Sequence, residues 1–172
     1  MTTFKYIIGD NIKLEFATVD DLDMIMNFQY LIINNMANKE YFCPLLKEEF
    51  KDALDNGVIS LLWDDDILVG LAVLNCKPKI EIIEEYCLSD VNDIGILDSV
   101  MIKDEYRGSK LQQQLINCLD SVIEKFNLKG VVATVHPDNI WSYNNLIACN
   151  YENIDKVIIH GGERFILFKS YK

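Results

Sequence analysis

The chain has 172 residues, of which 50% are hydrophobic and 25% are charged, and its formal net charge is −11. This length suits one domain over residues 1–172, and the apolar fraction is too high for a disordered chain. No apolar stretch approaches the ~20 residues that cross a bilayer, and residues 1–5 do not lead into the core of a signal peptide. We therefore expect a cytoplasmic protein that is not associated with a membrane.

Cysteine and histidine usage bears on metal and disulfide chemistry. The five cysteines are scattered without a CxxC pair, and the two histidines form no HExxH motif. This spacing argues against a disulfide framework and against a structural zinc site. We expect the cysteines to be small buried hydrophobic residues in a reducing compartment, and the protein to hold no metal.

Negative charge is concentrated in the first part of the chain. Residues 1–99 contain 19 acidic and 7 basic residues, whereas residues 100–172 contain 8 and 9. An acidic surface repels phosphate backbones, so we expect no nucleic-acid partner. The near-neutral second part can still receive an anionic cofactor, and the acidic first part favours a cationic substrate. The alternative is that acidic residues only keep the protein in solution.

The first 56 residues predict a strand followed by two helices. Residues 12–16 alternate apolar and charged side chains, as a half-buried strand does. Thr18 and Asp21 have capping-box spacing and begin a helix. Its apolar face is formed by Leu22, Ile25, Met26, Gln29 and Ile33. A second short helix covers residues 47–54, and Asn56-Gly57 is expected to end it in the left-handed conformation.

The middle of the chain is rich in strands. Residues 58–63 and 67–75 predict two strands that are joined by a tight turn at residues 64–66. Residues 77–92 are polar and mixed, with one helical turn expected at residues 80–86. Residues 94–102 then predict a long, mostly buried strand.

The last 65 residues alternate helices and strands. An amphipathic helix is predicted over residues 108–126, a strand over 130–135 and a helix over 140–149. Residues 157–160 and 164–168 predict a hairpin through Gly161-Gly162. This order describes an α/β fold with a mixed sheet and helices on both faces.

One segment has the features of an anion site. The buried strand at residues 94–102 runs through residues 103–110 directly into a long helix. The first amides of a helix lack intrahelical partners and carry partial positive charge, so such a turn suits a phosphate. Arg107 and Lys110 add cationic side chains, and Ser109 adds a hydroxyl. The alternative is an ordinary strand-to-helix turn with basic residues at its surface.

Two segments resemble a known family. Residues 100–112, with their Tyr-Arg-Gly core, resemble the acetyl-CoA loop of the GNAT N-acetyltransferases. Residues 133–145 resemble the second motif of that family, in which an asparagine follows a strand and a small residue comes three positions later. The resemblance implies a mixed, mostly antiparallel central sheet with helices on both faces. It also implies acetyl-CoA as co-substrate and an amine as acceptor.

The resemblance also assigns residues to the cofactor. It implies that the backbone of Val100, Met101 and Ile102 pairs with the pantetheine arm. It implies that the pyrophosphate lies on the turn formed by Arg107, Gly108, Ser109, Lys110, Leu111 and Gln112. Asn139 and Ser142 would contact the pantetheine arm or the adjacent phosphate.

The sequence departs from the family pattern at three positions. Lys110 and Gln112 stand where the family usually has glycine or alanine, so their side chains restrict how closely the backbone approaches the pyrophosphate. The ammonium of Lys110 can offset this by a charge-assisted contact. Leu146 stands where the family often has a tyrosine acid, so the proton for the leaving thiolate must come from another group or from water.

Asp98 is the candidate catalytic base, because strand alternation places it on the same face as Val100 and Ile102. The alternative is a structural carboxylate that binds a neighbouring amide or lysine. Among weaker candidates, Arg164 pairs either with a substrate carboxylate or with an acidic neighbour. Gln29 and Tyr30 are candidates for the wall of the acceptor pocket.

These observations predict an N-acetyltransferase that moves an acetyl group from acetyl-CoA to a small amine or an amino-acid-like acceptor. Two alternatives remain. One is a GNAT-shaped module that senses CoA without turnover, and the other is an acetyltransferase for a protein amine.

A homodimer is compatible with the apolar last strands. His136, which precedes Pro137, is expected either to hydrogen-bond the turn or to relay protons.

Overall fold

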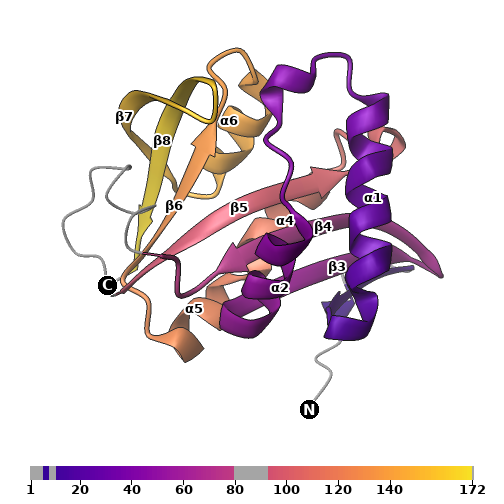
Figure 1. The fold of residues 1–172 in the computed structure, drawn as a ribbon. Coiled ribbons are helices and arrows are strands. Elements are labelled where there is room, and N and C mark those ends of the chain that lie inside the picture. The colour runs from indigo at the N-terminus through magenta and orange to yellow at the C-terminus, as the bar shows by residue number, and fades with distance from the viewer. Residues whose placement is uncertain (1–5, 8–10, 80–92, 172) are drawn as a thin grey trace.

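A computed structural model describes residues 6–7, 11–79 and 93–171 of the chain (Figure 1). The strands are β1 (Tyr6–Ile7), β2 (Ile12–Phe16), β3 (Gly57–Asp64), β4 (Ile67–Asn75), β5 (Ile94–Ile102), β6 (Gly130–Val135), β7 (Glu152–Ile159) and β8 (Gly162–Ser170). The helices are α1 (Leu22–Asn35), α2 (Lys47–Asn56), α4 (Leu111–Cys118), α5 (Asp120–Phe126) and α6 (Ile140–Ala148). The helical turn expected at residues 80–86 lies outside the described residues.

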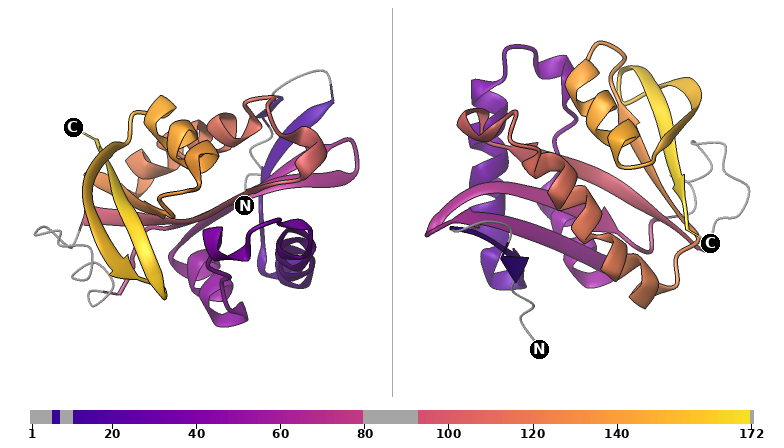
Figure 2. Two further views of the ribbon diagram at one scale, coloured as in Figure 1. Left: turned by 90° about the horizontal axis from the view of Figure 1, so that it is seen from above. Right: turned by 180° about the vertical axis from the view of Figure 1, so that it is seen from behind.

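The described strands form one sheet in the order β1-β2-β3-β4-β5-β6-β8-β7. Neighbouring strands are antiparallel except β5 and β6, which run parallel. Figure 2 shows α1 and α2 on one face of the sheet and α4, α5 and α6 on the other. The expected mixed, mostly antiparallel sheet with helices on both faces is confirmed.

Each face of the sheet has its own hydrophobic core. Leu111, Leu115 and Ile123 pack from α4 and α5 onto one face. Ile25 and Phe50 pack from α1 and α2 onto the other. Burying apolar area on both faces is what holds a layered α/β sheet together, at roughly 25 cal/mol for each Å² removed from water.

Helix α1 begins where the capping signal predicted. The backbone N–H of Thr18 donates to Oδ2 of Asp21 at 2.8 Å, and its hydroxyl donates to the same oxygen at 3.0 Å. One turn of 3-10 helix at Val19–Asp21 precedes the α-helix. The apolar face differs in detail from the prediction, because Phe28 and Ile32 are buried while Met26 and Ile33 are half-buried.

The predicted left-handed stop at Asn56-Gly57 is wrong. Gly57 has a φ of −164°, which is extended backbone, and it is the first residue of β3. A Cβ atom on Gly57 would lie 2.0 Å from the carbonyl oxygen of Leu74. The glycine is therefore required by close approach to β4, a constraint set by strand pairing that the local sequence does not contain.

The predicted hairpin at the C-terminal end is longer than expected. Strand β7 begins at Glu152 rather than at residue 157, and the turn is formed by His160 and Gly161, both with positive φ. Two consecutive residues with positive φ are typical of the two-residue turns that match the twist of paired strands. Gly162 already belongs to β8.

The helix predicted over residues 108–126 is wrong at its start and in its middle. Residues 108–110 form a turn, and the helix is interrupted at Leu119, so that α4 and α5 are separate. The thiol of Cys118 donates to the carbonyl of Leu115 at 2.9 Å, and the hydroxyl of Ser121 donates to the carbonyl of Cys118 at 3.0 Å. Side chains that bond helix carbonyls in this way bend or interrupt a helix.

None of the helices among the described residues is long and apolar enough to cross a bilayer.

Candidate active site

A cleft opens where β5 and β6 separate. The two strands pair only from Ile94–Gly130 to Leu97–Ala133, although β5 continues to Ile102 and β6 to Val135. The space between their diverging ends is a cavity of about 1000 Å³. This volume lies at the upper end of ordinary ligand pockets, so it suits a long or composite ligand.

The free edge of β5 faces this cleft. The N–H of Lys103 donates to the carbonyl of Val69 on β4 at 2.9 Å. Because hydrogen bonding alternates along an antiparallel strand, the backbone groups of Val100 and Ile102 point the opposite way, toward the cleft. An extended ligand arm can pair with these groups as an added strand does.

A turn with an anion-binding shape follows β5. Gly108 and Lys110 have positive φ angles of 79° and 63°, and α4 begins at Leu111. Gln114 donates to the carbonyl of Lys110 at 3.1 Å, so the N–H groups of the three preceding helical residues have no partner in the helix. The hydroxyl of Tyr106 donates to Asp64 at 2.6 Å and ties the turn to the end of β3.

Three side chains of this turn were predicted to contact a phosphate. Arg107 pairs with Asp104 at 2.8 Å, with more than half of both side chains exposed. The hydroxyl of Ser109 donates to the carbonyl of Tyr106. Lys110 is exposed at the cleft and forms no ion pair with a described residue. Lys110 therefore has the ammonium that is most available to an anion.

Asn139, Ser142 and Gln112 meet on the α4–α6 side of the cleft. Oδ1 of Asn139 accepts from the N–H of Ser142 at 3.2 Å and caps α6. Nε2 of Gln112 donates to Oγ of Ser142 at 3.4 Å, and Nδ2 of Asn145 donates to Oε1 of Gln112 at 2.8 Å. The side chain of Gln112 is thus held against α6, and all four residues line the cleft.

Asp98 lies at a β-bulge. Val73 of β4 pairs with Ser99 and Leu74 pairs with Leu97, so Asp98 is the extra residue in β5. The bulge breaks the alternation that placed Asp98 on the same face as Val100 and Ile102, and that part of the prediction is wrong. It arises from pairing with β4, which the sequence of β5 does not reveal.

Asp98 lines the cleft, and its side chain is exposed to the open space there. Desolvation by the neighbouring protein, followed by the charges of Glu49 and Asp52 on α2, raises the pKa of its carboxyl from 3.8 to about 7. The nearness of α2 places Asp98 toward the α1–α2 side of the sheet. A carboxyl with a pKa near neutral exchanges protons readily at physiological pH.

The loop between α1 and α2 covers the same side of the cleft. Tyr41, in this loop, packs its ring 5.1 Å from the ring of His136 at the end of β6. Nδ1 of His136 accepts from the N–H of Asp138 at 3.2 Å, so the predicted hydrogen bond to the turn is confirmed. Cys43, also in this loop, lines the cleft and is exposed, so the expectation of buried cysteines is wrong at this residue. Desolvation by the neighbouring protein is the main cause that raises the pKa of its thiol.

Arg164, on β8, is 6% exposed and lines the cleft. Its Nη1 donates to the carbonyl of Glu163 at 2.8 Å and its Nη2 to the carbonyl of Glu40 at 3.0 Å. The second bond fixes the loop between α1 and α2 to the sheet. The expectation that Arg164 pairs with an acidic neighbour is therefore wrong for the residues that the structure describes.

Two residues that were predicted for the acceptor pocket lie elsewhere. Gln29 exchanges two hydrogen bonds of 2.9 Å with the backbone of Leu45 and fastens α1 to the following loop. Tyr30 is 69% exposed, and neither residue lines the cleft. The loop that lines the cleft instead, around Tyr41 and Cys43, has no sequence motif.

Asn145 is a cleft residue that the sequence analysis missed. It bonds both Gln112 and Gln113, the latter through Oδ1 at 2.9 Å. Its spacing from Ser142 was the available signal, because residues three apart on a helix share a face.

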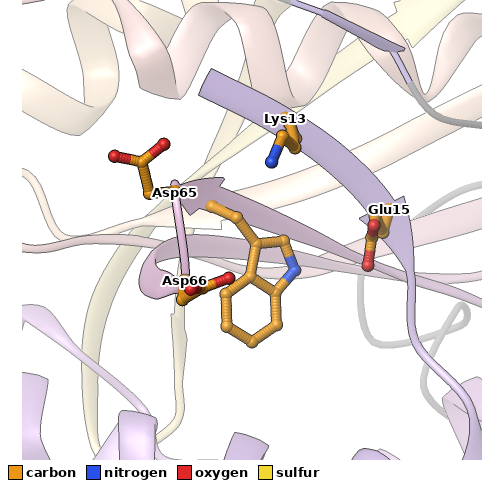
Figure 3. Close-up of a pocket in the computed structure, with 5 residues that line it drawn as sticks. Lys13, Glu15, Asp65 and Asp66 are labelled. Carbon is orange, nitrogen blue, oxygen red and sulfur yellow. The ribbon is translucent and has the colours of Figure 1, made fainter. Parts of the chain in front are cut away.

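A second, smaller cavity of about 270 Å³ lies beside β2 and shares no lining residue with the cleft. Figure 3 shows Lys13 and Glu15 on β2 at one side of it and Asp65 and Asp66 of the β3–β4 turn at the other. These are charged surface groups of both signs, and the cavity contains none of the backbone features that the cleft has.

No protein-family model and no curated relative matches the sequence. Solved structures match over nearly the whole chain. The ribosomal-protein-S5-alanine acetyltransferase of Vibrio fischeri is 13% identical with a TM-score of 0.71, covering 97% of this chain and 96% of its own. The protein yncA of Salmonella typhimurium, solved with its cofactor acetyl-CoA, is 11% identical with a TM-score of 0.71 over 94% of both chains.

A third similar structure is Naa50 of Arabidopsis thaliana in complex with the bisubstrate analogue CoA-Ac-MVNAL. It is 16% identical with a TM-score of 0.69, covering 94% of this chain and 99% of its own. At such identities the similarity establishes the fold. The chain has the fold of the GNAT N-acetyltransferases, as the two sequence motifs predicted.

Proposed function

We propose that this protein is an acetyl-CoA-dependent N-acetyltransferase that acetylates a small amine. The main support is the continuity of the cleft, which joins the free edge of β5 to the turn of unpaired amides before α4. Acetyl-CoA has a polar arm that suits a strand edge and a pyrophosphate that suits a helix N-terminus. Similar structures hold acetyl-CoA or a CoA conjugate.

In this proposal each part of the cofactor has its own binding groups. The backbone groups of Val100 and Ile102 pair with the pantetheine arm, whereas those of Met101, between them, point toward β4. The turn from Arg107 to Gln112 receives the pyrophosphate through its N–H groups, with Lys110 adding charge. Asn139 and Ser142 border the arm from the α6 side. An N–H group of the β5 edge that points at the thioester oxygen stabilises the negative charge of the tetrahedral intermediate.

The amine enters from the α1–α2 side, where Asp98 lies. An ammonium cannot attack a thioester, so Asp98 in its ionised form removes a proton. The nitrogen lone pair then forms a bond to the acetyl carbon. As the carbon–sulfur bond breaks, the nitrogen gives its second proton to water, and the amide and the CoA thiolate are released. Leu146 is buried beside the cleft and has no acidic proton, so water protonates the thiolate.

The proposal is tested by combining a calorimetric titration of acetyl-CoA with an assay of thiol release. We expect one site for each chain, and release of free CoA only when an amine is present. A panel of small amines is run beside a panel of peptides with free N-termini and lysines. Tight binding without thiol release on either panel contradicts an enzyme and favours a CoA-binding module. Release with peptides alone favours a protein acceptor.

A further inference from the structure

Arg164 is a buried cation without a counter-charge among the described residues. Its two acceptors are the neutral carbonyls of Glu163 and Glu40, and no described carboxylate lies within 4.0 Å of its guanidinium. A guanidinium has five N–H donors, so most of them remain after these two bonds. Burial of an unpaired charge is costly, and this charge borders an open cleft.

Arg164 and Asp98 lie on the same face of the sheet. Ile96 on β5 and Ile166 on β8 pack in one hydrophobic cluster. Asp98 comes two residues after Ile96, and Arg164 comes two residues before Ile166. Because β8 runs opposite to β5 and β6, both steps lead toward the same end of the sheet. Only β6 separates the two strands, so their backbones are about 10 Å apart where the sheet is closed.

The surrounding loop supports this placement. The thiol of Cys43, which covers this part of the cleft, is influenced by the charges of both Arg164 and Asp98. The other charged residues that line the cleft are Arg107 and Lys110, which belong to the turn before α4. The acceptor end of the cleft therefore presents one carboxyl group and one fixed guanidinium.

We infer that the acceptor carries a carboxylate as well as its amine, and that Arg164 binds this carboxylate while the amine faces Asp98. This inference rests on the proposed function and narrows the acceptor to a free amino acid. A guanidinium matches a carboxylate with two parallel hydrogen bonds, and carbonyls already hold this one in position. A peptide has no carboxylate beside its N-terminal amine and leaves the buried charge of Arg164 unpaired.

The test compares each of the common L-amino acids with its own carboxamide, at saturating acetyl-CoA, by thiol release. The carboxamide keeps the side chain and the amine and lacks only the negative charge. We expect at least one amino acid to have a kcat/KM at least about tenfold above that of its carboxamide, the range of a charged hydrogen bond. A ratio near one in the unmodified protein overturns the inference, and this comparison needs no variant.

Two variants locate the effect. Arg164→Gln is expected to bring the ratio close to one by removing the guanidinium. Lys156→Gln removes one positive charge from an exposed ion pair with Glu163 on the neighbouring strand, and it is expected to keep the ratio. An Arg164→Gln protein that binds acetyl-CoA and keeps the original preference contradicts the role of Arg164.

A binding measurement separates this inference from the proposed function. N-acetylated amino acids and their carboxamides are titrated into the CoA-bound protein. If no amine is acetylated but the N-acetylated amino acids bind through their carboxylate and lose affinity in Arg164→Gln, the proposed function fails and the carboxylate site stands. If amines are acetylated with no dependence on a carboxylate, the proposed function stands and the carboxylate site is refuted.

Discussion

The surroundings of Asp98 disfavour the ionised form of its carboxyl. Desolvation by the neighbouring protein and the nearby carboxylates of Glu49 and Asp52 raise its pKa to about 7. The sequence identified Asp98 correctly as a carboxylate that interrupts an apolar strand. It did not reveal the bulge, or the acidic residues of α2 that lie close to Asp98, because both arise from tertiary pairing.

Replacing Asp98 with asparagine removes the proposed base and keeps its shape. We expect kcat to fall by about 100-fold, the usual contribution of a positioned base, while the Kd of acetyl-CoA changes little. In the unmodified protein kcat/KM is expected to rise with pH through an apparent pKa near 7, because only the ionised carboxylate accepts a proton. The measurements are a pH–rate profile and a calorimetric titration.

The control for Asp98→Asn is Asp55→Asn, which removes an exposed carboxylate from α2 that does not line the cleft.

The stability of the protein provides a second measurement of the Asp98→Asn variant. The pKa of Asp98 is higher in the folded chain than its ordinary 3.8, so its ionisation destabilises the fold as pH rises from about 4 to 7. Asp98→Asn is expected to raise the Tm at pH 8 relative to the unmodified protein. Equal losses of kcat and cofactor affinity contradict the catalytic role.

Lys110 illustrates what a motif can predict at a single position. The resemblance located it in a turn where the family usually has glycine or alanine, and the structure gives it a left-handed φ of 63°. This conformation costs a lysine roughly 1 kcal/mol or more relative to glycine. An exposed lysine in this conformation, beside amides without helical partners, is consistent with a contact to an anion.

At the scale of elements, α4 and α6 are joined by amide side chains across the cofactor side of the cleft. Gln112 and Gln113 of α4 bond Asn145 of α6, and Gln112 also reaches Ser142. The sequence predicted that the side chain of Gln112 restricts how closely the backbone approaches the pyrophosphate. The structure turns its side chain toward α6, a placement that depends on where the two helices pack.

Gln112→Ala is expected to lower the free energy of unfolding by about 1 kcal/mol, the net value of a partly buried hydrogen bond. Urea denaturation measures this change. A double-mutant cycle with Asn145→Ala is expected to show a coupling of about 0.5–1.5 kcal/mol. The control is Asn117→Ala, an exposed change on the same helix, which is expected to be neutral or slightly stabilising. Strict additivity in the cycle contradicts the contact.

Local patterns predicted most elements because their causes are local. Alternation located β2 and β5, and the capping signal located the start of α1. Asp65, in the predicted tight turn between β3 and β4, has a positive φ, which is common in such turns. Errors occurred where distant parts decide. Gly57 is extended because it packs against β4, and the α4–α5 interruption depends on side chains that bond helix carbonyls.

At the scale of the whole molecule, the sheet separates two approaches to one cleft. The α4–α6 side presents the turn and the amides that suit a cofactor, and the α1–α2 side presents Asp98 and Arg164. The opening exists because β5 and β6 pair over only part of their length. No pattern in a single sequence shows where a strand pairing ends, so the binding of the pantetheine arm to β5 was predicted from the resemblance alone.

A crystal structure of the protein with acetyl-CoA tests this arrangement most directly. We predict pyrophosphate oxygens within hydrogen-bond distance of the N–H groups at residues 108–113. The pantetheine arm is expected to pair with Val100 and Ile102, and the acetyl group to end near Asp98. An empty cleft at saturating acetyl-CoA, or a cofactor bound elsewhere on the chain, would contradict it.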